Sequence, residues 1–109
     1  MKVIILPEAL EYLDEMAFVL FEKQYFSYLE TSKRYVDDLI DDIEKKLPTR
    51  LHRPAPQYYD KYGKDLYYAV FKKNRRTSYY AFFSKYNDNG QTVYLVCYIG
   101  NNHTDAQHI

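Results

Sequence analysis

Arg76 and His103 are the two side chains whose types and predicted positions best suit chemistry on a charged group. Arginine carries a permanent, forked positive charge, and histidine is the side chain that ordinarily titrates near neutral pH. The two residues lie at the outer ends of two runs rich in aromatic and β-branched residues, which Asn89-Gly90 separates. Such a dipeptide between such runs is the strongest short-range signal of a β-hairpin. Pairing outward from this turn places Arg76 opposite His103, which predicts an anion site with a proton-transfer group.

The position of the turn decides this pairing. Within the strand itself, alternation puts Tyr80 rather than Tyr79 on the face of Arg76, where its ring can stack on an unpaired base. With a four-residue loop, Arg76 faces Asn101 instead, and His103 lies diagonal to it on the same face. A shift of one residue would separate Arg76 and His103 onto opposite faces, because side chains alternate along a strand.

A cluster of positive charges adjoins the predicted hairpin, at Lys72, Lys73, Arg75 and Arg76. One interpretation is a solvated turn that keeps a sheet edge from pairing with another chain. The other is a phosphate clamp, because clustered cations beside exposed aromatic rings are typical of contact with RNA or DNA. The chain has 14 tyrosines and no tryptophan, so aromatic partners are abundant, although most tyrosines are expected to fill half-buried strand positions.

The formal net charge of zero hides a division along the chain. Residues 1–48 carry six Lys or Arg against eleven Asp or Glu, whereas residues 49–109 carry nine against four. Binding to phosphate depends on local positive potential and not on the global sum. The second half therefore suits a phosphate-rich partner, whereas strong non-specific binding to nucleic acid is less expected than for a wholly basic protein.

Several classes of protein are disfavoured by what the chain lacks. The opening run MKVIIL is too short for a signal peptide or a membrane span, and Pro7 follows it at once. Cys97 is the only cysteine, so an internal disulfide is impossible and a reduced, cytoplasmic setting is the simplest expectation. No His or Cys residues have metal-ligand spacing, and the three glycines form no phosphate-binding loop, so we expect no metal and no cofactor.

The first half of the chain predicts one strand and two helices. Lys2–Leu6 is a short apolar strand, and Pro7 suits the first position of a helix that runs to about Gln24. Ser27 and Glu30 have the spacing of a capping box for a second helix, which Pro48 ends. The short connection predicts that the two helices pack as an antiparallel hairpin.

The second half predicts a sheet. An irregular loop, Thr49–Gly63, leads to three segments rich in strand formers, which are Leu66–Lys72, Arg76–Tyr86 and Thr92–Ile99. The last residues, Gly100–Ile109, are expected to extend an edge or to form a loose tail. The chain is thus predicted to be a single α+β domain over residues 1–109. In it, a helical hairpin packs on one face of a mostly antiparallel sheet of about four strands.

Both faces of this sheet are apolar or aromatic. Val93, Leu95, Cys97 and Ile99 are expected on one face with Tyr80 and Phe82, whereas the opposite face receives Tyr79, Phe83, Tyr94, Val96 and Tyr98. The helical hairpin can cover only one face. We therefore expect the other to present tyrosines to solvent or to a partner.

The order of elements and two segments resemble the RelE/ParE superfamily of bacterial type II toxin–antitoxin toxins. The segments are RRTSYYAFF, which contains Arg76 and Tyr79, and the final strand with its tail, VYLVCYIGNNHTDAQHI. In ribosome-dependent ribonucleases of this superfamily, an arginine at the position of Arg76 contacts the scissile phosphate. A histidine at the position of His103 takes part in acid–base chemistry in some of them.

The resemblance implies a toxin that cleaves mRNA in the ribosomal A site and thereby inhibits translation. Arg76 and His103 would be the catalytic residues, and the residues expected to bind RNA are Lys72, Lys73, Arg75 and Tyr80. The implied partners are a cognate antitoxin protein, the ribosome and mRNA, with no membrane.

Two other functions stay open for the same fold. The strand before Arg76 reads LYYAVF without basic residues, and the basic ending common in the family is replaced by NNHTDAQHI. One alternative is a DNA gyrase inhibitor that acts by binding. The other is a non-toxic module that binds an antitoxin or acts as a co-repressor with it.

Overall fold

A five-stranded sheet with the order β1-β5-β4-β3-β2 forms the centre of the computed structural model, which describes residues 1–23 and 28–109. The strands are β1 (Lys2–Ile5), β2 (Arg53–Pro54), β3 (Tyr67–Lys72), β4 (Ser78–Asp88) and β5 (Gln91–Asn101). β1 pairs with β5 in parallel, and the other neighbours are antiparallel. The α+β class is confirmed, but the expected count of about four strands is wrong, because β2 adds a fifth.

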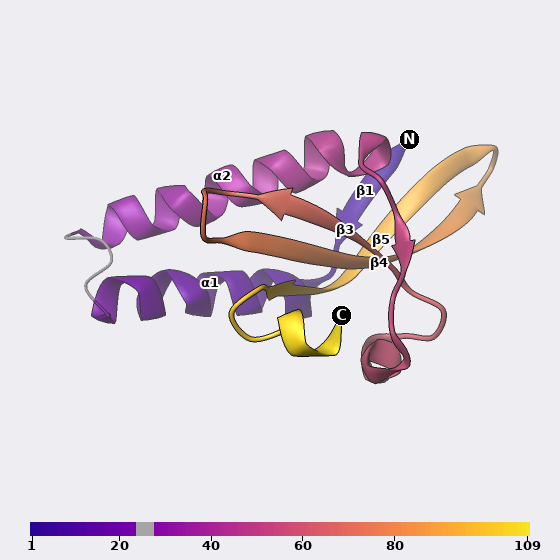
Figure 1. Cartoon of the computed structure of the whole chain (residues 1–109). Coiled ribbons are helices and arrows are strands. Elements are labelled where there is room, and N and C mark those ends of the chain that lie inside the picture. Colours follow the sequence, from indigo (N-terminus) through magenta and orange to yellow (C-terminus); the bar gives the residue numbers. More distant parts are fainter. Residues whose placement is uncertain (24–27) are drawn as a thin grey trace.

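Two helices follow β1 and run antiparallel to each other (Figure 1). They are α1 (Pro7–Glu22) and α2 (Leu29–Lys46), and Pro7 occupies the first turn as predicted. The expected helix end near Gln24 and the Ser27 cap lie outside the described residues. The apolar stripes of both helices pack against one face of the sheet in the main core, whose helical members are Ala9, Leu13, Ala17, Val36, Leu39 and Ile43.

The β4–β5 hairpin turns at Asn89 and Gly90, which have φ angles of 53° and 85°. Positive φ at both central residues is what a tight hairpin turn requires. From Asp88 opposite Gln91, the pairing follows the predicted two-residue turn until it reaches Phe83. The turn and the first half of the register are therefore confirmed.

A β-bulge then shifts the register by one residue. Phe83 pairs with Val96, but Phe82 pairs with Tyr98, so Cys97 is the extra residue on β5. A bulge of this kind moves every later side chain to the opposite face. Ile99 accordingly joins the helix-side core, whereas Tyr98 packs beside Phe82 on the other face. The predicted faces of Tyr98 and Ile99 are therefore wrong.

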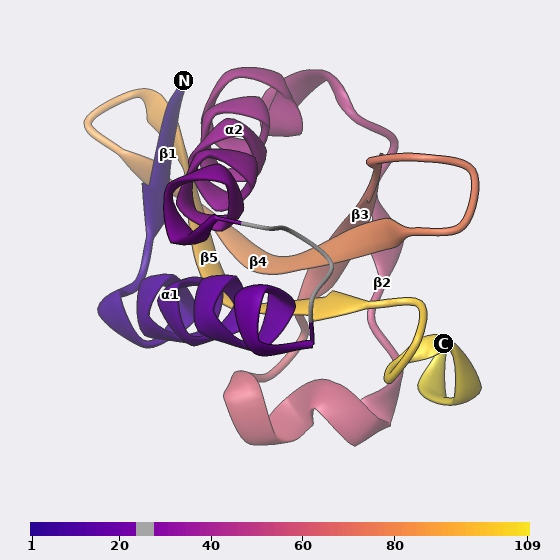
Figure 2. The ribbon, with the colours of Figure 1, turned by 90° about the vertical axis from the view of Figure 1, so that its left-hand side faces the viewer.

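The second face of the sheet is covered in part by the chain between α2 and β3. This segment was expected to be an irregular loop, but it contains β2 and the 3-10 helix η2 (Gln57–Tyr62). Figure 2 shows η2 on the opposite side of the sheet from α2. Tyr59 of η2 is buried against Phe82 and Leu66 in a second cluster. Part of the aromatic face that was expected to be open is thus packed core.

The end of the chain is folded and not a loose tail. Gly100 and Asn101 complete β5, a turn follows, and the 3-10 helix η3 (Ala106–His108) comes last. Two further local elements are the short helix η1 (Leu47–Thr49) and the β3–β4 connection at residues 73–77, which carries Arg76. No helix within residues 1–23 and 28–109 is long and apolar enough to cross a membrane.

Candidate functional site

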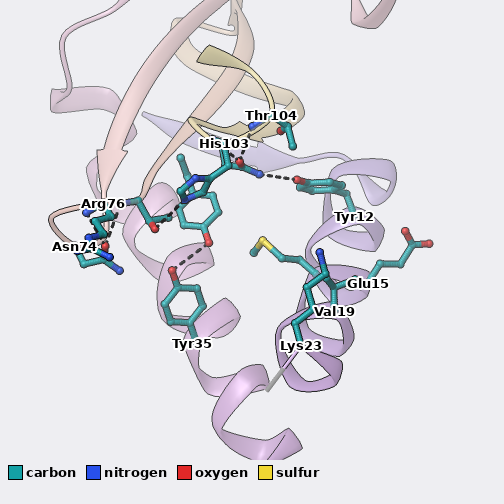
Figure 3. A pocket seen from close by; sticks show the side chains of 13 residues that line it. Tyr12, Glu15, Val19, Lys23, Tyr35, Asn74, Arg76, His103 and Thr104 are labelled. Carbon is teal, nitrogen blue, oxygen red and sulfur yellow. Dashed lines mark hydrogen bonds between the residues drawn. The ribbon is translucent and has the colours of Figure 1, made fainter. Parts of the chain in front are cut away.

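A cavity of about 740 Å³ opens between α1, α2 and the end of the β4–β5 hairpin that lies away from its turn (Figure 3). Its walls come from segments far apart in the sequence. The lining residues are Tyr12, Glu15, Met16, Val19, Lys23, Tyr35, Asn74, Arg76, Thr77, Tyr79, Asn101, His103 and Thr104.

Arg76 and His103 both line this cavity, although not through the predicted pairing. Because of the bulge, Tyr79 and not Ser78 pairs with Asn101 at the end of β5, and the Ser78 N–H donates to Asn102 Oδ1 at 2.9 Å. Thr77 Oγ1 lies 3.3 Å from His103 Nε2. The expected facing of Arg76 and His103 is therefore wrong, but the folding of the loop and the turn still brings both side chains to one opening.

The backbone around Arg76 is held by two asparagines. Asn74 Oδ1 accepts the N–H groups of Arg76 and Thr77, each at 3.0 Å, which forms a side-chain-stabilised turn. Asn102 Nδ2 donates to the Arg76 carbonyl at 2.9 Å. Within the described part of the chain, no carboxylate pairs with the Arg76 guanidinium. Its forked donors are therefore available to an anion.

His103 stands on a turn that one asparagine closes. Asn101 Oδ1 accepts the N–H of His103 at 2.9 Å and that of Thr104 at 3.1 Å. The imidazole is exposed to solvent and contacts the Thr77 hydroxyl. A histidine in this setting can exchange protons with a ligand in the cavity, because its ring is accessible while its backbone is fixed.

Three tyrosine hydroxyls lie along the inner wall. Those of Tyr35 and Tyr79 are 3.1 Å apart, and Asn101 Nδ2 donates to the Tyr12 hydroxyl at 3.3 Å. Burial raises the pKa of Tyr79 above the ordinary tyrosine value, and the hydrogen bond with Tyr35 raises it further. Burial likewise raises the pKa of Tyr12. These two phenols stay protonated at neutral pH, so they can donate hydrogen bonds but cannot serve as bases.

The other predicted phosphate-binding residues do not line the cavity. Lys73 lies next to it, with Nζ 4.8 Å from the centre of the Tyr35 ring. Lys72, the last residue of β3, and Arg75, on the β3–β4 connection, are both exposed. Tyr80 packs on the opposite face, with its ring 6.1 Å from that of Tyr68. The prediction that Tyr80, and not Tyr79, shares the face of Arg76 is therefore wrong.

The wall formed by α1 was missed by reasoning from sequence. Glu15, Val19 and Lys23 recur every four residues, and Tyr12 and Met16 have the same spacing, so each set shares a helix face. This stripe was a detectable signal, but nothing local indicated which strand end it approaches. Figure 3 shows the Glu15 carboxylate turned away from Arg76 and His103.

The chemistry of the cavity suits an anion with an apolar body. Arg76 and Lys23 supply positive charge, whereas Met16 and Val19 supply apolar surface. Within residues 1–23 and 28–109, no group of three or more His, Cys, Asp or Glu side chains is arranged to hold a metal ion. Burial raises the pKa of the Cys97 thiol, which disfavours the reactive thiolate.

Comparison of the chain with models of protein families, with curated proteins and with solved structures found no match. The resemblance to RelE/ParE toxins therefore stays a prediction, and function is inferred from the cavity and its residues.

Proposed function

We propose that the chain is the toxin component of a type II toxin–antitoxin system and that it is a ribosome-dependent mRNA endoribonuclease. The observation that carries the proposal is the shared position of Arg76 and His103 in one cavity. An unpaired guanidinium and an accessible imidazole on one cavity can supply a cation for the phosphate and a group for proton transfer. The site is sparse, and the ribosome would supply the positioning of the mRNA.

The proposed reaction is attack by a ribose 2′-hydroxyl on the adjacent phosphate. The hydroxyl loses its proton, its oxygen bonds to phosphorus, and the bond from phosphorus to the 5′-oxygen breaks. The leaving oxygen gains a proton, and the products are a 2′,3′-cyclic phosphate and a 5′-hydroxyl. Each proton transfer needs an acid or a base, and the charge on the phosphoryl oxygens needs stabilisation.

The side chains divide these tasks according to their chemistry. His103 provides one of the two proton transfers as an acid or a base and water provides the other, while Thr77 Oγ1, 3.3 Å from Nε2, orients the ring. Arg76 binds the phosphoryl oxygens through its forked N–H groups. Lys73 and Lys23 add positive charge near the cavity, while the protonated Tyr79 stays a donor.

The apolar part of the cavity supports a nucleotide as the ligand. Met16 and Val19 can contact a base or a ribose while Arg76 holds the phosphate. The proposed ribosomal target also implies a cytoplasmic location. A small antitoxin would be the cognate partner, bound to the basic β3–β4 connection or to a sheet edge. A short neighbouring gene with a DNA-binding half would support that partner.

The test is expression of the chain with His103→Ala, with primer extension on cellular mRNA after induction. We expect wild-type chain to arrest growth and cut mRNA, and His103→Ala to relieve both effects. His108→Phe is the matched control, because His108 lies outside the cavity and a phenyl ring removes the imidazole but can keep the stack on Tyr58. Intact mRNA together with DNA damage would favour the gyrase inhibitor, and normal growth would favour the non-toxic module.

A further inference from the structure

The turn that carries His103 is tied to the protein by a buried carboxylate. Asp105 is only 4% exposed, and its side-chain oxygens accept three hydrogen bonds. Tyr59 Oη donates to Oδ1 at 2.9 Å, while the Asn101 N–H at 3.0 Å and the Thr104 hydroxyl at 2.9 Å donate to Oδ2. The Asp105 N–H in turn donates to the Asn101 carbonyl at 2.8 Å. The carboxylate therefore closes the turn of residues 101–105 from inside.

Tyr59 is a rigid anchor for this carboxylate. Its side chain is 1% exposed, and its ring stacks on Phe82 of β4 with centres 4.0 Å apart. The neighbouring Tyr58 stacks on His108 at 3.6 Å, so two adjacent residues of η2 hold two residues of the tail. The position of the turn thus depends on η2, which lies more than forty residues earlier in the chain.

Gly100 provides the space that the carboxylate occupies. A Cβ atom added at Gly100 would overlap Asp105 Oδ2 and would lie 2.6 Å from its Cγ. Any other residue at position 100 would therefore displace Asp105 or deform β5. The Asp105 carboxylate can therefore pack against the end of β5 only because position 100 has no side chain.

We propose that Asp105 and Tyr59 are positioning residues for His103. Neither touches the cavity, but His103 lies inside the turn they close, two residues from each of Asn101 and Asp105. The catalytic consequence rests on the proposed function, whereas the positioning itself is a property of the fold. Losing the Tyr59 hydroxyl frees the turn while the Phe82 stack keeps the ring in place.

The test compares Tyr59→Phe with Tyr68→Phe. Both variants lose one phenolic hydroxyl from the same buried cluster, but only Tyr59 bonds to the tail. NMR measures amide hydrogen exchange at Asn101, His103 and Thr104. Ribosome-bound mRNA cleavage gives the maximal rate and the half-saturating toxin concentration.

For Tyr59→Phe we expect exchange at these amides to be about tenfold faster, as loss of one hydrogen bond to a charged group implies. The maximal cleavage rate should fall by a similar factor while half-saturation is unchanged. Tyr68→Phe should alter neither. Gly100→Ala, which displaces Asp105 sterically, should reproduce the Tyr59→Phe pattern.

Equal exchange in Tyr59→Phe and Tyr68→Phe would overturn the proposal. So would faster exchange with an unchanged cleavage rate, provided that His103→Ala cleaves more slowly than wild type. A wild-type chain that does not cleave mRNA would refute the proposed function instead. The exchange comparison would then still decide whether Tyr59 holds the turn.

Discussion

Replacing Arg76 by alanine tests the site most directly, because Arg75 beside it provides a control of equal charge. Both changes remove one positive charge from the same connection between β3 and β4. Only Arg76 lines the cavity, whereas Arg75 is exposed outside it. If cleavage needs a direct contact between the side chain and a phosphate, the cleavage rates of the two variants must differ. If only the overall positive potential matters, they must behave alike.

The expected loss of cleavage rate follows from the hydrogen bonds that the Arg76 guanidinium can donate and from its exposure to solvent. A hydrogen bond to a charged group contributes about 1.5–3 kcal/mol, and loss of one donor aimed at developing charge slows reactions by about 10²–10³-fold. Arg76 is exposed, so solvent screens its charge and the lower end applies. We expect cleavage by Arg76→Ala to be about 100-fold slower. Arg76→Lys keeps the positive charge but loses the forked pair of donors, so its cleavage rate should lie between those of wild type and Arg76→Ala.

The assay is single-turnover cleavage of mRNA on purified ribosomes, with thermal unfolding of each variant measured in parallel. Within the described residues the guanidinium has no ionic partner to leave unpaired, so melting temperatures should stay within about 2 °C of wild type. Arg75→Ala should cleave within about threefold of the wild-type rate, as expected of a screened surface charge. Equal losses in Arg75→Ala and Arg76→Ala would refute the assignment of Arg76.

Two further predictions concern stability. Ser32 is fully buried in α2, and its hydroxyl has no hydrogen-bond partner within residues 1–23 and 28–109. Ser32→Ala should therefore raise the free energy of unfolding, measured by urea denaturation, by about 1 kcal/mol. Thr31→Ala, at an exposed position of the same helix, is the control. An unchanged or lower value would contradict this. Burial raises the pKa of Tyr59 and Tyr79 in the folded protein. Above pH 10 these tyrosines lose their protons in the unfolded chain before they do so in the folded one, which favours unfolding. The free energy of unfolding should therefore fall by about 1.4 kcal/mol per pH unit for each of the two tyrosines. Tyr79→Phe should make this slope shallower, and an equal slope would show that Tyr79 ionises as freely in the folded protein.

The hairpin illustrates how far sequence reasoning reached. Asn89-Gly90 correctly predicted the turn and the pairing as far as Phe83 opposite Val96, because turn chemistry and alternation act locally. The bulge at Cys97 was not predictable in the same way. It depends on how both sheet faces pack at once, with Ile99 taken by the helix-side core and Tyr98 by the cluster around Tyr59.

The segment before β3 shows the same limit. Residues 49–63 have no regular period, so an irregular loop was the reasonable expectation. Tyr59 is nevertheless almost fully buried, because β3 and β4 leave an apolar surface around Phe82 that only a returning segment can cover. The aromatic face that was expected to be free is consequently part of the core.

By itself, the sequence determined the α+β class, the succession of strand, two helices and sheet, and the tight turn, and it predicted Arg76 and His103 as site residues. These follow from periodicity, turn residues and side-chain chemistry, which are local properties. Only the tertiary structure decided that Thr77 contacts His103, that Tyr79 replaces Tyr80 beside Arg76, and that α1 supplies the opposite wall. The pairing of Tyr79 with Asn101 depends on one added residue in β5, and the turn that carries His103 is held by the buried Asp105. Both arise from packing between segments distant in the chain.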